Sequence, residues 1–163
     1  MTKEFIAEAN QFLMQVFKSL DEIKLDLAKN ELDHICYRVE TETEYQYLKK
    51  QFLLESELLS NKEINGREIC VFKLNTPLKF KERTIYLLEL PAPKKGSKYN
   101  SGFEHVEFVI KDDLRDFMSS RPDLNFNIKG LDKKVNPEVR LNFSVGAIKF
   151  HNHKLEYVIR FLD

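Results

Sequence analysis

The sequence predicts an α+β domain built from two pseudo-symmetric β-α-β-β-β modules that form one curved, incomplete β-barrel, with an extra helix at the N-terminus. Three observations support this prediction. Apolar residues recur at helical spacing near the N-terminus, a strand–helix–strands pattern occurs twice, and a segment rich in proline, glycine and lysine separates the two copies. We therefore expect a single domain over 1–163, with a helical segment at 1–30 and modules at 31–92 and 102–163.

The N-terminal segment predicts an amphipathic helix. Apolar residues from Phe5 to Leu20 recur every three or four positions, Thr2 can cap the first turn, and the charged residues fall off the apolar stripe. Because the polar face carries both signs of charge, we expect this helix to pack on the domain rather than on a membrane surface.

The first module is predicted to start with a half-polar strand over 32–39 and to continue with a helix that begins near Thr41. Extended runs follow at about 55–63, 67–74 and 83–90. The Asn65-Gly66 pair between the first two runs is a strong hairpin signal.

The second module is predicted to repeat this order after the connector at 91–102. A strand over 103–110 leads into a helix over 112–120, and extended runs follow at 124–130, 138–145 and 147–162. The last run is expected to be a hairpin that turns near Asn152, and His151 and His153 are interpreted as residues of that turn.

The composition is that of an ordinary globular protein and excludes several classes. Of the 163 residues, 26 are Lys or Arg and 26 are Asp or Glu, so the net charge is zero and predicts neither nucleic acid nor a membrane surface as partner. No apolar run approaches the roughly 18 residues of a spanning helix. The two cysteines lie in apolar segments and form no disulfide framework, which fits a reducing compartment. We therefore expect a cytoplasmic protein.

The repeat places two histidines and two glutamates at matching positions. Aligning LDHICYRV with FEHVEFVI superimposes His34 on His105, 71 residues apart, and aligning LLEL with KLEY superimposes Glu89 on Glu156, 67 residues apart. Alternate residues of a strand face opposite sides of a sheet. Both histidines and Glu156 are thus expected on the face away from the helices, whereas Glu89 lies in a strand that is apolar on both faces and is expected to be buried with a partner.

Two imidazoles and one or two carboxylates on one face of a sheet are the ligands that an intermediate divalent metal prefers. We therefore predict a metal site at His34, His105, Glu156 and Glu89. Glu89 has two other interpretations, as a catalytic general base or as a member of a buried ion pair. The metal is expected to be Zn, Ni, Co, Mn or Fe, and the ligand types do not choose among them.

Further side chains are predicted to line the same pocket and to contact a substrate. Arg38 and Arg160 can clamp a carboxylate or phosphate with two hydrogen bonds, or can instead pair with Glu107 or Glu156. Cys36 lies two residues from His34 on the same face and can line the pocket, although a packed thiol is the more frequent role for a buried cysteine. The predicted substrate-binding residues are Arg38, Arg160, Cys36 and Asn142.

Over about 32–161 these residues resemble the vicinal-oxygen-chelate superfamily, which includes glyoxalase I, extradiol dioxygenases and bleomycin-resistance proteins. In that superfamily the first and last strands of each module supply metal ligands. The segments LDHICYRV, ELPAPK and FEHVEFVI and the N-terminal helix look most like the bacterial YecM family of metal-binding proteins. The positions that match the superfamily's ligands are His34, Glu89, His105 and Glu156.

The resemblance implies a metal-dependent isomerase, lyase or dioxygenase that acts on a small substrate with two adjacent oxygens. No segment resembles a glutathione-recognition element. A non-catalytic module that binds a small molecule is the main alternative, and a scaffold domain with structural histidines is a third. Both monomers and dimers are compatible with such modules.

Overall fold

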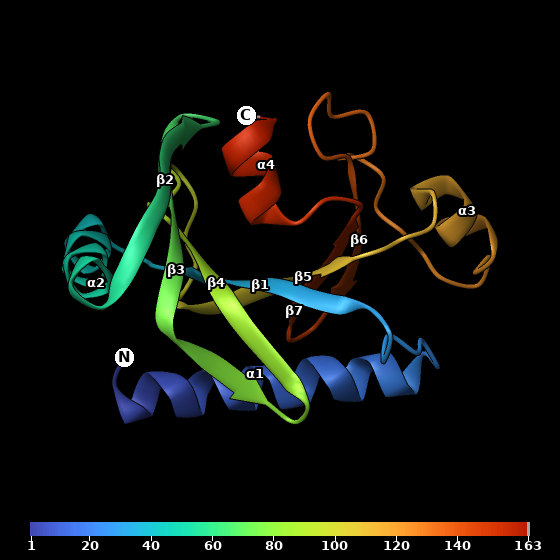
Figure 1. The fold of residues 1–163 in the computed structure, drawn as a ribbon, viewed down its shortest axis with the longest axis horizontal. Coiled ribbons are helices and arrows are strands. Elements are labelled where there is room, and N and C mark those ends of the chain that lie inside the picture. The colour runs from blue at the N-terminus through green and yellow to red at the C-terminus, as the bar shows by residue number, and fades with distance from the viewer. Residues whose placement is uncertain (163) are drawn as a thin grey trace.

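The computed structural model describes residues 1–162. Its elements in chain order are α1 (Lys3–Glu22), β1 (Glu31–Arg38), α2 (Glu42–Glu55), β2 (Ser56–Ile64), β3 (Arg67–Phe80), β4 (Arg83–Pro91), β5 (Gly102–Val109), α3 (Leu114–Ser119), β6 (Glu138–Phe143), β7 (Gly146–His151) and α4 (Leu155–Phe161). Within the described residues, all the strands form one mixed sheet in the order β2-β3-β4-β1-β5-β7-β6 (Figure 1). The predicted α+β class is thereby confirmed.

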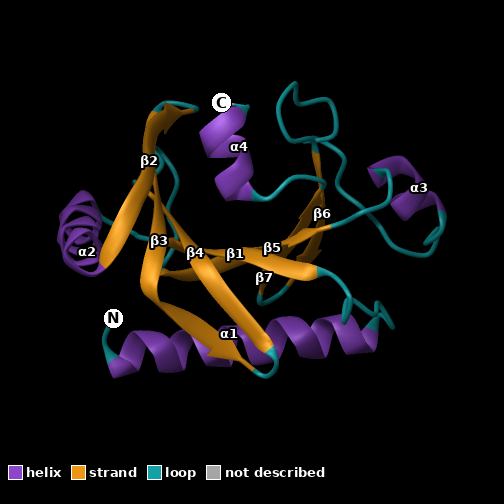
Figure 2. Ribbon diagram, in the orientation of Figure 1, coloured by secondary structure: helices purple, strands orange, loops and turns teal. Residues whose placement is uncertain are grey.

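The sheet consists of two related halves that meet at its centre. In each half the first strand pairs in parallel with the last, β1 with β4 and β5 with β7. The antiparallel pair of β1 with β5 joins the halves. The sheet curves so that two arms rise on either side of α4, while α1 runs along the opposite, convex face (Figure 2).

The N-terminal helix forms as predicted and covers the convex face. Thr2 accepts a hydrogen bond from the amide of Phe5, and the apolar stripe of α1 is buried. The rings of Phe12 and Phe103 stack at a centroid distance of 5.8 Å, which fixes the helix against β5. None of the helices in residues 1–162 is both long and apolar enough to cross a bilayer.

The predicted hairpin over 147–162 is wrong, because β7 ends at His151 and the chain then forms α4. Apolar residues in KLEYVIRFL fit both a strand and a helical period, so the sequence pattern alone does not decide. The deciding contact is tertiary: Oδ2 of Asp33, on β1, accepts a hydrogen bond from the amide of Leu155 at 2.9 Å and caps the helix. An i,i+4 ion pair between Glu156 and Arg160 supports the same conformation.

The predicted strand over 124–130 is reduced to one bridge between Asn127 and Arg140. The side chain of Asn127 accepts a hydrogen bond from the amide of Lys129, a local turn that ends the pairing. Within the described residues, the second module therefore carries two strands after its helix where the first carries three.

Gly146, the first residue of β7, holds a position that only glycine fits. Its φ is +150°, and a Cβ there would lie 2.5 Å from the Glu104 carbonyl oxygen and 2.9 Å from a ring carbon of Phe12. We expect Gly146→Ala to lower the free energy of unfolding by about 2–4 kcal/mol, measured by urea denaturation. Gly96→Ala is the control, because Gly96 also has a positive φ, +76°, but no atom lies within 4 Å of the place that a Cβ would take. Equal losses in both variants would contradict the steric explanation.

Candidate metal centre

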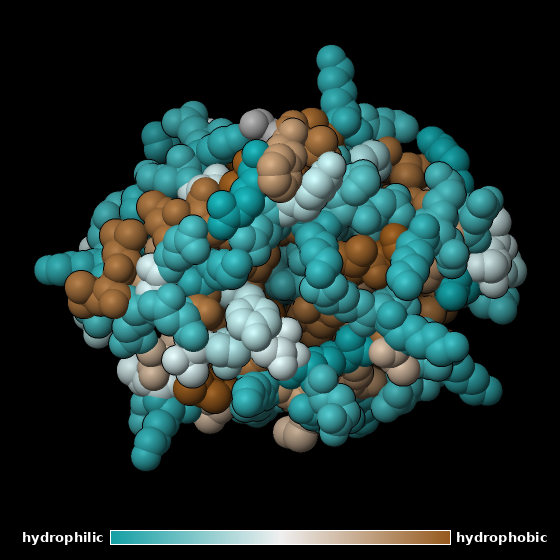
Figure 3. Space-filling model, in the orientation of Figure 1, coloured by the Kyte–Doolittle hydropathy of each residue, from teal (hydrophilic) through white to brown (hydrophobic). Residues whose placement is uncertain are grey.

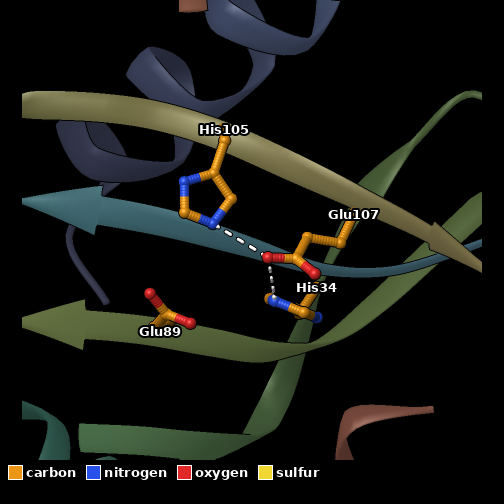
Figure 4. A group of neighbouring side chains, drawn as sticks. All are labelled: His34, Glu89, His105 and Glu107. Atoms are coloured by element: carbon orange, nitrogen blue, oxygen red, sulfur yellow. Dashed lines mark ion pairs between the residues drawn. The ribbon is translucent and has the colours of Figure 1, made fainter. Parts of the chain in front are cut away.

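Three neighbouring strands bring a cluster of two histidines and two glutamates together on the concave face (Figure 4). His34 lies opposite Glu107 in the β1–β5 pair, and Cys36 lies opposite both His105 on β5 and Glu89 on β4. One ligand atom from each member of the cluster lies within 4.8 Å of the others. The members of this cluster, called the central cluster below, are His34, Glu89, His105 and Glu107.

Glu107 is the centre of this arrangement. Its Oε1 lies 3.1 Å from Nε2 of His105 and 3.3 Å from Nε2 of His34. Nζ of Lys149 donates a hydrogen bond to the same oxygen at 2.8 Å. Burial raises the pKa of Glu107, but Lys149 and His34 outweigh this and hold the pKa well below its usual range. A negative charge is therefore fixed between the two imidazoles.

Three buried imidazoles present a nitrogen that has no hydrogen-bond partner among residues 1–162. These atoms are the Nε2 nitrogens of His34, His105 and His151. The other nitrogen, Nδ1, lies near an oxygen in each case. Nδ1 of His34 lies 2.9 Å from Asp33, and Nδ1 of His105 lies 3.8 Å from Glu104. Nδ1 of His151 lies 2.5 Å from the carbonyl oxygen of His153. A histidine that donates from one nitrogen to a carboxylate or carbonyl presents the other to a metal, which is the usual arrangement at metal sites.

The charge state of His34 follows from its carboxylate neighbours. Burial lowers its pKa, but Glu107 and Asp33 outweigh burial and raise the pKa to about 10. Without a metal, a proton on His34 balances part of the negative charge of these carboxylates. A metal ion bound at Nε2 would take the place of that proton, so metal binding there would be coupled to proton release.

Asp33 reaches this face because β1 contains a bulge. The β1–β5 register shifts between Leu32 and His34, so that Asp33 and His34 both project to the concave side. Asp33, His34 and His151 form a second group with metal-ligand spacing. Strict alternation places Asp33 on the opposite face, so the sequence pattern does not reveal it.

Glu156, a predicted ligand, lies outside the central cluster. It belongs to α4 instead of a strand, and its carboxylate accepts hydrogen bonds from Lys73 at 3.0 Å and from Arg160 at 2.9 Å. Arg160 also lies 3.4 Å from Glu57. Both predicted site residues of the C-terminal segment thus take part in ion pairs that hold α4 over the arm formed by β2 and β3.

The other predicted pocket residues have ordinary partners. Arg38 pairs with Glu104 at 3.6 Å and stacks on the ring of Tyr99. Cys36 is fully buried, and its Sγ donates to Glu89 at 3.5 Å. Asn142 is exposed, and its side-chain oxygen accepts a hydrogen bond from Nε of Arg140 on the same strand. Cys36 therefore lies beside the central cluster, whereas the contacts of Asn142 give it no connection to it.

Three residues of the site are not predicted as ligands or site residues from the sequence. Glu107 follows His105 by two positions, so strand alternation already places it on the same face, but the pattern favours it only as a partner for an arginine. His151 and Lys149 are hidden by the alignment of LLEL with KLEY. The correct structural match to LLEL is the segment AIKF in β7.

Two modules whose first strands pair antiparallel, with a polar cluster on the concave face, define the glyoxalase-like, vicinal-oxygen-chelate class of fold. A solved methylmalonyl-CoA epimerase, in complex with methylmalonyl-CoA and NH4+, shares this fold with a TM-score of 0.54 and 14% identity over 77% of this chain and 96% of that one. Within this class the chain belongs to the YecM family, whose model, described as YecM protein, matches residues 1–161.

Relatives of the family are similar over nearly the whole chain. Protein YecM of Escherichia coli strain K12 is 29% identical over 166 residues, which cover 90% of this chain and 88% of that protein. The solved structural-genomics structure Protein EC4020 superimposes with a TM-score of 0.81 and 25% identity, covering 96% of this chain and 90% of that one. The resemblance predicted from the sequence is thereby confirmed for both the family and the fold.

Proposed function

We propose that this protein binds one divalent metal ion at the central cluster and uses it to bind a small substrate through two adjacent oxygens. The observation that carries the proposal is the convergence of two buried Nε2 atoms, from His34 and His105, on one oxygen of Glu107: they lie 3.3 and 3.1 Å from it, and neither forms a well-aligned hydrogen bond. Buried imidazole nitrogens without a partner are costly unless a ligand satisfies them.

The donor set fits such an ion. Ligand atoms about 2.1 Å from a metal lie at most about 4.2 Å from one another, which is close to the 4.8 Å within which the cluster atoms lie. Two nitrogens and carboxylate oxygens suit Zn, Ni, Co, Mn and Fe(II). The bound ion would supply Lewis acidity, which stabilises negative charge on a substrate oxygen and is the chemistry of an isomerase or lyase; with iron it would also serve dioxygen chemistry.

The protein's own residues have separate roles in this proposal. Asp33 holds His34 in the orientation that presents Nε2, and Glu107 supplies the fixed negative charge. Glu89 is half-buried, and its carboxylate accepts a hydrogen bond from the weak Sγ–H donor of Cys36. That weak contact leaves the carboxylate available either as a ligand or as a base that takes a proton from the substrate.

A pocket of about 370 Å³ lies next to residues that flank His34 and can admit a small molecule. Its wall includes Asp33, which precedes His34 on β1, and Leu87, which lies opposite His34 on β4, but none of the four residues of the central cluster. Lys73, Tyr86 and Lys154 form other parts of the wall. On the face shown in Figure 3, hydrophilic side chains dominate and apolar ones are scattered, so this pocket is a better candidate for binding than that outer surface.

A non-catalytic small-molecule binder is the second candidate. The ion pair between Lys149 and Glu107 favours it, because this pair already neutralises the central carboxylate without a metal. In that case the same pocket would hold its ligand by shape and hydrogen bonds alone.

Metal content per chain tests the first proposal. We expect untagged protein, reconstituted with Zn, Ni, Co, Mn or anaerobic Fe(II) and then desalted, to retain about one equivalent by plasma mass spectrometry. His105→Ala should lose it, because a buried imidazole ligand is removed. His153→Ala and Glu156→Gln are matched controls outside the central cluster and should keep it. A wild-type protein that retains none of these metals would contradict the proposal and favour the binding module.

A further inference from the structure

The two halves of the sheet differ by one charge reversal at equivalent positions. In the β1–β4 pair Cys36, two residues after His34, lies opposite Glu89. In the β5–β7 pair Glu107, two residues after His105, lies opposite Lys149. Lys149 is therefore the structural counterpart of Glu89. Where strict symmetry would give a second carboxylate, the chain has an ammonium group.

This ammonium group is buried at the central cluster. The side chain of Lys149 is 15% exposed, and its Nζ lies 2.8 Å from Oε1 of Glu107. The ammonium donates a hydrogen bond to the Glu107 carboxylate, so the chain places a positive charge at the central cluster.

The position of the ammonium opposes a metal ion directly. Oε1 of Glu107 faces Nζ of Lys149 and the Nε2 atoms of both cluster histidines, so a metal held by these nitrogens would compete with the ammonium for the same oxygen. A divalent ion and the ammonium are both positively charged, so they repel each other at this short separation.

The same charge changes what the loaded site attracts. Counting only the two cluster carboxylates, a divalent ion and residue 149, with neutral histidines, the sum is +1 with Lys149 and would be −1 with a carboxylate at that position. Asp33 and Glu104, beside the histidines, add the same negative charge in both cases. Lys149 therefore makes the site two units more positive than a carboxylate would, and a nearby ammonium donor favours a negatively charged oxygen ligand over a neutral one.

We infer that Lys149 is a specificity-determining residue. Its ammonium group stands where a second ligand carboxylate would be and weakens the binding of a metal ion at the central cluster. Once a metal ion is bound, the same ammonium group makes the site prefer small anionic oxygen ligands such as carboxylates. This inference rests on the proposed metal centre and names the substrate class of that site.

Metal affinity tests the first half of the inference. We expect Lys149→Glu to bind Zn²⁺ or Co²⁺ at least tenfold more tightly than wild type in competition with a chelating dye. Lys18→Met is the matched control, because Lys18 also forms an ion pair, with Glu22, but lies on α1 away from the cluster. Unchanged affinity in Lys149→Glu would overturn the inference.

Oxalate binding tests the second half. Oxalate is a small dianion with two adjacent oxygens, and its binding to the Co²⁺-loaded protein can be followed by calorimetry and by the visible spectrum of the ion. We expect at least tenfold weaker binding in Lys149→Met than in wild type, and recovery of most of the affinity in Lys149→Arg. Equal oxalate affinity in wild type and Lys149→Met would overturn the inference while leaving the metal centre intact.

Lys149→Met leaves Glu107 without its ammonium partner and can impair folding. The double variant Lys149→Met with Glu107→Gln removes both charges. Its oxalate affinity is compared with that of Glu107→Gln alone. If wild type retains no metal but Lys149→Glu does, the proposed function fails and the inference about Lys149 holds for metal affinity. If neither protein binds metal, both fail.

Discussion

Glu107→Gln is expected to lower the free energy of unfolding of the metal-free protein by about 3–5 kcal/mol. The substitution removes the negative charge that lies 2.8 Å from Nζ of Lys149, and it leaves this ammonium buried without its partner. His34 loses a stabilising carboxylate at 3.3 Å in the same step. Urea denaturation in the presence of a chelator measures the loss.

The double variant of Glu107→Gln with Lys149→Met distinguishes a charge effect from a packing effect. It removes the uncompensated ammonium, so we expect most of the lost stability to return. Glu156→Gln breaks a partly exposed pair with Lys73 and should cost no more than about 1 kcal/mol. A double variant as unstable as Glu107→Gln alone would contradict the buried-charge explanation.

Asp33→Ala is expected to lower the free energy of unfolding by about 2–3 kcal/mol and to release α4. Oδ2 of Asp33 is the acceptor for the Leu155 amide and for Nδ1 of His34, both at 2.9 Å. Without this acceptor, the first turn of α4 has no side-chain cap, because Lys154 provides none. Amide hydrogen exchange over 155–161 should become much faster.

Asp33→Asn is the matched control for this experiment. An amide oxygen can still accept from Leu155, so exchange in α4 should stay close to that of wild type, although the charge beside His34 is lost. Equal acceleration in Asp33→Ala and Asp33→Asn would show that charge, and not the hydrogen bond, holds the helix.

The sequence predicted those parts of the fold whose signals are local and periodic. The stripe in α1, the alternation in β1 and β5, and the Asn65-Gly66 turn between β2 and β3 each specify one conformation over a few residues. The histidine repeat also placed His34 and His105 on one face correctly, because strand alternation holds from His34 to Cys36 and from His105 to Val109.

The rest of the site depends on contacts between distant residues. KLEYVIRFL is compatible with a strand or a helix, and the cap from Asp33, 122 residues away, decides between them. Because the sequence pattern was interpreted as a strand over 154–162, the prediction placed Glu156 in the site and left out Lys149 and His151. A bulge adds one residue to β1 without any mark in the hydrophobic pattern, so the position of Asp33 could not be predicted from alternation.

The antiparallel pairing of β1 with β5 also determines how the two halves of the sheet unfold. The hydrogen bonds at the middle of the sheet belong to both halves, and α1 packs across strands of each. Neither half can separate without exposing the backbone of its first strand and the apolar side chains beneath α1. The stretch at 92–101 lies outside the strands and contacts the first half through Tyr99 and Ser101. We therefore expect a chain cut between these contacts and β4 to stay together as a two-fragment complex, and the intact protein to unfold as one cooperative unit.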